Sequence, residues 1–220
     1  MTTTAFIGAN GFVSNVSPST PLPVNIGSAT LSVTADGVEI KNDAGNPIPV
    51  SDNSSSLTVD GKAYRTTATI TRPSNATAYT AGDVVGDTGG SAIISLTAAG
   101  PTAGFVIIQS ISLVFSDSTV PSGMGAFRVH LYSASPTAIA DNAAFDLVSG
   151  ERDTYMGFID LPTPADLGSS LYTQTDYPGR LIKLAAASTT LFAELETRGA
   201  YTPVSASTVS IRVNLLEAGL

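Results

Sequence analysis

Regular alternation of apolar and polar residues between Gly104 and Ser133 constrains the fold of this chain more than any other feature. Two alternating runs, 105–116 and 126–133, are separated by a turn-forming stretch, 117–125. Successive side chains of a β-strand point to opposite faces, so the pattern predicts two strands with one face against a core. The residues expected on that face, interrupted only by Gln109, are Phe105, Ile107, Ile111, Leu113, Phe115, Phe127, Val129 and Leu131.

Similar short runs recur along the rest of the C-terminal two thirds. Strands are predicted at 66–72, 91–98, 155–161, 170–176, 180–184, 189–198 and 207–216. The pair 170–176 and 180–184 flanks Tyr177-Pro178-Gly179 and reads as a hairpin. Only 141–147 suggests a helical turn, capped by Asp141. Strands of this length separated by turns predict an all-β fold over residues 63–220, an antiparallel β-sandwich of jelly-roll or Ig-like type.

Residues 1–62 differ in composition and are predicted to form an extended N-terminal arm. They hold few large apolar residues, and an isolated two-stranded hairpin is marginal in water. Strand patterning is still visible in Val38–Lys41, which follows a turn at Asp36-Gly37. The arm is therefore either disordered or ordered by lying on a neighbour, and the patterning favours the neighbour. Its apolar contact candidates are Val38, Ile40, Ile48 and Val50.

The charge content is low and its balance is acidic. Charged residues make up 13% of the chain, hydrophobic residues 43%, and the formal net charge is −8. An acidic chain repels phosphate backbones, which excludes nucleic acid as a direct partner. A surface built from Ser and Thr is easily buried against another protein, because few ions need desolvation. Composition alone fits a subunit of an assembly and a Thr-rich extracellular domain equally well.

Compartment signals are few. The chain has no Cys, which excludes disulfides, a thiol nucleophile and Cys-ligated zinc. No apolar run reaches the ~20 residues that span a bilayer, and the start lacks the basic and apolar regions of a signal peptide. We therefore expect no membrane partner, and a product that is made and kept in the cytoplasm, or released by lysis rather than by secretion.

The sequence carries no pattern typical of catalysis. The single histidine, His130, lies on the polar face of its predicted strand between Arg128 and Tyr132. A Ser-His-Asp triad would need this imidazole, but no Gly-x-Ser-x-Gly elbow accompanies it. We interpret His130 as a surface or subunit-contact residue, and Arg128 and Tyr132 as contact candidates beside it. The chain is expected not to be an enzyme.

Cofactor and metal patterns are also missing from the sequence. Asp83 and Asp87 in a Gly-rich loop could help bind calcium, but their spacing differs from the EF-hand loop, which favours turn capping. No glycine-rich phosphate loop precedes a helix. Aromatic residues make up only 7%, which disfavours a sugar site that stacks rings, although six tyrosines remain contact candidates. An acidic cluster, interpreted as a solvated loop rim, comprises Asp141, Asp146, Glu151 and Asp153.

Several segments resemble structural proteins encoded by tailed bacteriophages and prophages. They are scattered through the C-terminal domain at 72–85, 120–132, 141–145, 167–172 and 199–203. Upstream, residues 38–50 look like a linker-hairpin near the start of several phage virion proteins. The family supplies no motif of functional residues.

The resemblance implies a virion component rather than an enzyme. A capsid decoration, or cement, protein on the outer head surface is favoured, with a tail- or fibre-associated receptor- or glycan-binding protein as the alternative. Its expected partners are the major capsid protein and copies of itself, for which a trimer is plausible, with no cofactor.

Overall fold

The structure, a computed structural model, describes residues 5–7, 13–15, 62–90 and 92–218. The chain divides into two compact units, Met1–Leu57 and Thr58–Leu220. In the first unit, β1 (Ala5–Ile7) pairs antiparallel with β2 (Val13–Asn15). The remainder of the predicted arm, including Val38, Ile40, Ile48 and Val50, lies outside the described residues.

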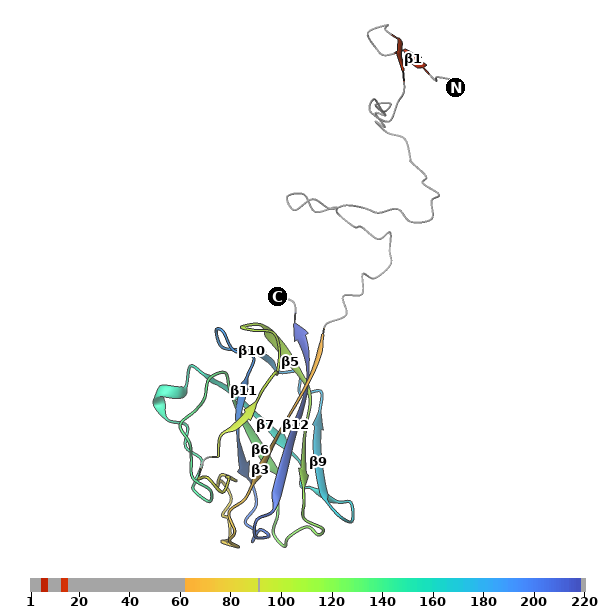
Figure 1. The fold of residues 1–220 in the computed structure, drawn as a ribbon. Helices are drawn as coiled ribbons and strands as arrows, with labels where there is room; N and C mark the ends of the chain where they lie inside the picture. The colour runs from red at the N-terminus through yellow and green to blue at the C-terminus, as the bar shows by residue number, and fades with distance from the viewer. Residues whose placement is uncertain (1–4, 8–12, 16–61, 91, 219–220) are drawn as a thin grey trace. The chain divides into compact units, whose positions relative to one another are not determined.

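The second unit is built from two antiparallel sheets (Figure 1). The larger sheet has the order β3-β12-β5-β9-β8, with β10 also paired to β5. Its strands are β3 (Ala63–Thr71), β5 (Phe105–Phe115), β8 (Ala165–Asp166), β9 (Leu171–Asp176), β10 (Leu181–Lys183) and β12 (Thr208–Ala218). The smaller sheet, in the order β4-β11-β6-β7, comprises β4 (Ile94–Leu96), β6 (Phe127–Tyr132), β7 (Tyr155–Leu161) and β11 (Leu191–Thr197). A 3-10 turn, η1 (Ser149–Glu151), precedes β7.

The strand order identifies the sandwich as a jelly roll. The pairs β3/β12, β4/β11, β5/β9 and β6/β7 nest inside one another along the chain, as in one long hairpin. Successive pairs alternate between the larger and the smaller sheet. This is the arrangement obtained when a long hairpin is rolled up, and it defines the double Greek key of jelly rolls. Of the two predicted sandwich types, the structure is therefore the jelly roll and not the Ig-like one.

The core lies between the two sheets and is filled by side chains from both. On β12 the predicted inward residues Val209, Ile211, Val213 and Leu215 are all buried. The prediction is also confirmed for Phe127, Val129 and Leu131 on β6. Across the layers, the rings of Phe115 and Phe127 lie with their centroids 5.1 Å apart, joining the larger sheet to the smaller.

A β-bulge at Gln109 corrects the predicted inward face of β5. The register between β12 and β5 shifts by one residue at this point. Asn214 lies opposite Ser110 and Leu215 lies opposite Ile108, so Gln109 has no opposite residue on β12. The extra residue reverses the alternation, because a slip of one residue turns every side chain to the other face. Beyond the bulge Val106 and Ile108 are buried, whereas Phe105 and Ile107 are only half-buried on the outer face.

The same bulge explains why the predicted hairpin at 170–184 is wrong. β9 and β10 do not pair with each other; both pair with β5, on either side of Gln109. The amide of Tyr177, which has a φ of 50°, donates to the carbonyl of Gln109 at the break. The stretch Tyr177-Pro178-Gly179 therefore carries the chain across the bulge along one edge of β5.

The connection from β6 to β7, residues 133–154, lies along the smaller sheet. The predicted helical turn at 141–147 is absent: residue Asn142 has a φ of 62°, and Asp83 and Val84 form bridges to Ala144 and to Glu196 of β11. The amide of Val84 donates to the carbonyl of Ala143 at 2.8 Å, which ties this connection to the one between β3 and β4. The amide of Val85 donates to the carbonyl of Leu195 at 2.7 Å, which ties the connection between β3 and β4 to β11. No helix in the described part of the chain is long and apolar enough to cross a bilayer.

Candidate functional site

The predicted contact residues Arg128, His130 and Tyr132 occupy the face of β6 that points away from the core. Their surroundings correct the expectation of an exposed polar face. His130 is 3% exposed and Tyr132 is fully buried, whereas Arg128 is half-buried. The interpretation of His130 as a surface residue is therefore wrong, because the connections beside β11 and β6 cover this part of the sheet. Whether any of the three residues contacts a partner stays a prediction.

His130 has a partner on each ring nitrogen and on one ring face. Its Nε2 lies 2.7 Å from Glu196 Oε2 on β11, and its Nδ1 lies 2.9 Å from the Tyr155 hydroxyl on β7. The ring of Phe145 stacks on the imidazole with 3.6 Å between centroids and 12° between planes. Glu196 also accepts from Arg198 Nη1 at 2.6 Å. The imidazole is thus fixed between three elements of the smaller sheet and its covering connection.

The electrostatics of this group favour a neutral imidazole beside a carboxylate. Burial lowers the pKa of His130, and the hydrogen bond to Glu196 opposes that shift without reversing it. A neutral ring that donates from Nε2 to Glu196 accepts from Tyr155 at Nδ1, so both bonds are satisfied by one tautomer. The arrangement is a fully satisfied polar network, and such networks fix one conformation of the groups they join.

A second buried carboxylate, Glu194, lies two residues before Glu196 on β11. It is 1% exposed and its Oε2 accepts from the Tyr132 hydroxyl at 2.9 Å. Its Oε1 is buried and has no hydrogen-bond partner in the described part of the chain. Burial raises the pKa of Glu194 to about 7, against the opposing effect of the Tyr132 bond. This side chain therefore changes its charge near neutral pH.

A third buried group joins the end of β3 to the covering connections. Arg72, 1% exposed, donates from Nε to the Tyr79 hydroxyl and places its guanidinium 4.7 Å from the centre of that ring. The same hydroxyl donates to Asp141 Oδ1 at 2.6 Å, which also accepts from the amide of Gly86 at 2.9 Å. Arg72 and Asp141 form an ion pair at 3.4 Å. The interpretation of Asp141 as part of a solvated rim is therefore wrong.

These buried groups do not form a site for catalysis on an external substrate. Both nitrogens of His130 are engaged and one face of its ring is stacked, so the imidazole is closed off from solvent and from an external substrate. Among the described residues, no group of three His, Asp or Glu side chains could hold a metal ion. Asp83 accepts from the amide and the hydroxyl of Thr80, 2.6 and 2.9 Å, which confirms its turn-capping role.

Of the three contact candidates on β6, Arg128 is the one that reaches the surface. It makes a two-point bond to Asp160, opposite it on β7, with distances of 2.7 and 3.1 Å. Its guanidinium lies 3.7 Å from the centre of the Phe158 ring, and Phe158 is 40% exposed. The hydrogen bond from Arg128 lowers the pKa of Asp160. This charged pair over an exposed ring is a small surface feature beside the buried histidine.

Sugar-binding features are weak in the described part of the chain. An open cavity of about 410 Å³ has Ser133, Asp153, Met156 and Lys183 among its lining residues, and no aromatic ring lines it. Of the tyrosines considered as contacts, Tyr79, Tyr132 and Tyr201 are buried in the single chain, and Tyr177 is well exposed. Tyr177 follows the exposed Asp176 at the end of β9, away from the residues that line this cavity.

Sequence reasoning missed the partners of His130, because they are far away in the chain. Glu194 and Glu196 alternate with core residues on β11, and such alternation normally indicates a solvated face. The covering connections that bury this face have no periodic pattern. The one available signal was Phe145, an aromatic residue in a loop otherwise poor in large apolar side chains.

No protein-family model and no curated protein matches the sequence. Solved structures with some likeness are chains of virus particles. The structure entitled "KBV activated particle at acidic pH" aligns with a TM-score of 0.31 and 11% identity, covering 93% of this chain and 88% of that one. A Desmodium yellow mottle tymovirus chain gives 0.25 and 12%, with 78% and 96% covered. A Mud Crab dicistrovirus chain gives 0.29 and 15%, with 94% and 90% covered.

These TM-scores all lie below 0.5, so the likeness does not by itself establish a shared fold. The assignment of the jelly roll depends on the strand order described above.

Proposed function

We propose that this chain is a non-enzymatic structural component of a tailed-phage virion, a capsid decoration protein that binds the outer head surface and stabilises the shell. The observation that carries the proposal is a jelly roll whose interior is filled by side chains. Jelly rolls occur in virus capsids, lectins and cupins. Because one fold serves many functions, the choice among these depends on the sites the chain offers.

The interior argues against a cupin-like role. The side chains between the sheets are almost all apolar, with residues such as Ile111, Leu113, Leu131, Leu195 and Val213 fully buried. Among the described residues, no group of His, Asp or Glu side chains that could hold a metal ion occurs between the strands. A lectin-like role is disfavoured because no aromatic ring lines the open cavity beside Ser133 and Lys183. Of the three roles that jelly rolls are known to have, the capsid role, in which the domain presents its surface to other proteins, fits these observations best.

The outer face of the larger sheet suits burial against protein. Between the bulge and the C-terminal end of β5, the outward residues of this sheet mainly carry hydroxyl and amide groups. Some of them are hydrogen-bonded to one another, such as Thr69 to Ser210 and Asn214 to Ser110, both at 2.8 Å. Beyond the bulge the face becomes apolar, with Phe105, Ile107 and Leu181. Such a face can be covered without desolvating many charges.

The N-terminal arm supplies the means of linking subunits in this proposal. It would run over neighbouring copies or over the major capsid protein, and many copies would act together so that rupture breaks several contacts at once. A trimer is a plausible form of the self-association.

Imaging of purified particles tests this function. Antibodies raised against residues 62–220 should label the head surface of the virus that encodes the chain. Label at the tail would select the alternative, a tail- or fibre-associated receptor- or glycan-binding protein. Particles that carry no label would refute a virion role. Tail labelling together with binding of the purified protein to a glycan array would establish that alternative.

A further inference from the structure

β3 pairs with β12 on one side only, and its other edge is a long edge of the described sandwich without a neighbouring strand. β4 has three residues and β8 has two, with Pro162 and Pro164 ahead of β8. The edge of β7 is interrupted at Gly157, and Arg180 Nη1 donates to the free carbonyl of Met156 at 2.6 Å. β3 has nine residues, and the chain covers its outer edge at Thr71, whose carbonyl accepts from the amide of Thr88 at 2.9 Å. The part of the edge from Arg65 to Thr69 has no such protection. Unpaired edges of this kind are templates for pairing with another chain.

The backbone groups that face this edge follow from the pairing with β12. At the two ends of β3, the carbonyl of Lys62 accepts from Glu217 and the amide of Arg72 donates to Ser207, both 2.9 Å. Antiparallel ladders alternate, so even-numbered residues bond to β12 and odd-numbered residues point their N–H and C=O outward. Within the described residues, the outward backbone groups of Arg65, Thr67 and Thr69 have no partner.

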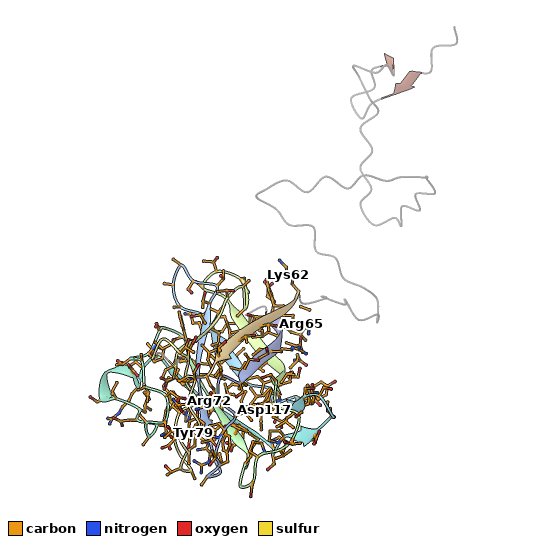
Figure 2. The ribbon with its side chains drawn as sticks, turned by 60° about the horizontal axis from the view of Figure 1, so that its bottom comes forward. Lys62, Arg65, Arg72, Tyr79 and Asp117 are labelled. Carbon is orange, nitrogen blue, oxygen red and sulfur yellow. The ribbon has the colours of Figure 1, made fainter. Side chains whose placement is uncertain are left out.

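We propose that this edge is paired, antiparallel, by the segment Val38–Lys41 from the arm of a second copy of this chain, with Glu39 opposite Arg65. The choice of a second copy rests on the proposed function, in which arms join neighbouring copies. The arm ends where the edge begins, since Lys62 immediately precedes β3; Figure 2 shows Lys62 and Arg65 at one end of that strand and Arg72 toward the other.

Charge and side-chain pattern select this register. Glu39 then lies on the outer face beside the exposed Arg65, an opposite-charge cross-strand pair. In the same register Ile40 is opposed to Tyr64 and Val38 to Thr66. Tyr64 packs against the core from the rim of the sheet, and Thr66 is buried. The apolar residues of the segment thus meet the core side of the edge, and its acidic residue meets the cationic side chain.

The arm is long enough to reach a neighbour. Residues 42–62 span up to about 70 Å when fully extended at about 3.3 Å per residue. The longest strand, β12, has eleven residues and covers about 37 Å at 3.4 Å per residue. The reach of the arm therefore exceeds the length of one sandwich, and the segment can leave its own domain for the next one.

Disulfide trapping tests the inference, and the chain offers a clean background because it has no cysteine. Full-length E39C and R65C carrying different tags are mixed and oxidised. Directly opposed Cα atoms in a hydrogen-bonded pair lie about 5.5 Å apart, within the range a disulfide bridges. The matched control is Q174C, exposed on the outer face of β9 near the other edge of the sheet. We expect the E39C–R65C heterodimer to exceed the E39C–Q174C product about tenfold.

Three results would overturn the inference. Equal yields with R65C and Q174C would mean that the segment has no preferred register on β3. An intramolecular bridge in the double variant E39C/R65C, with no heterodimer from the single variants, would place the segment on its own domain. Dimers of T67C alone would mean that two β3 edges pair about a twofold axis. If antibodies label the head surface but the E39C–R65C heterodimer does not form, the proposed function stands and only the pairing of the arm with β3 is refuted.

Discussion

The buried carboxylate of Glu194 makes stability depend on pH in a direction that can be worked out. Its pKa rises from an ordinary value of 4.5 to about 7 because the side chain is buried, and the negative charge of Glu151 adds to the rise. The folded protein therefore holds this proton more tightly than the unfolded chain does. The resulting stabilisation is complete below the unfolded pKa and is lost as the pH rises through about 7.

The size of the effect follows from the same pKa difference. One pKa unit corresponds to about 1.4 kcal/mol, so the free energy of unfolding should fall by roughly 2 to 3 kcal/mol between pH 5 and pH 8 through this group alone. Glu194→Gln removes the titration and keeps the shape of the side chain. The cost of placing an amide beside the unpartnered site is the same at every pH and cancels in the comparison.

Urea unfolding of the wild type and Glu194→Gln at pH 5, 6, 7 and 8 measures this difference directly. We expect the variant to gain about 2 to 3 kcal/mol relative to the wild type over that range, with most of the change between pH 5 and pH 7 and little above pH 7. The control is Glu217→Gln, near the C-terminal end of β12, which also removes one carboxylate from this acidic protein. A wild-type-minus-variant difference that stays constant from pH 5 to pH 8 would refute the assignment of a protonated, buried Glu194.

Three other substitutions test the buried networks and the protected edge by urea unfolding. Arg72→Met leaves the carboxylate of Asp141 without its cation and should cost about 3 to 5 kcal/mol, whereas Arg212→Met on the outer face of β12 should cost under about 1. His130→Phe leaves two polar groups without their ring partner and should cost about 2 to 4 kcal/mol, and equal stability would refute the network. Gly157→Ala adds a Cβ 2.4 Å from Arg180 at a φ of 90°. That change should cost about 1 to 3 kcal/mol, against less than about 0.5 for Gly150→Ala, whose Cβ meets nothing within 4 Å.

Strands whose alternation is unbroken were predictable from the sequence. β12 alternates over its whole length beside a core, and its four predicted inward residues are buried. β7 was predicted at its observed bounds, Tyr155–Leu161, because Pro162 follows it. In such strands, local pattern and tertiary packing agree, so the side-chain period determines the face.

The errors arise where tertiary pairing overrides the local pattern. The bulge at Gln109 depends on register with β12 and on the bond to Tyr177, neither of which is visible in 105–116 itself. His130 was expected at the surface because its neighbours in the strand are polar, and only the fold brings Glu196, Tyr155 and Phe145 around it. Burial of a polar face by an irregular connection cannot be read from periodicity.

Binding to heads with and without the arm tests the central claim most directly. The domain that begins at Gly61 contains the described core, so a chain lacking Met1–Asp60 should fold by itself. Purified heads of the encoding virus, stripped of this protein, are sedimented with either form. We expect the full chain to cosediment and the shortened chain, folded by circular dichroism and urea unfolding, to remain in the supernatant. Cosedimentation of both forms with equal affinity, or of neither, would contradict an arm-dependent decoration protein.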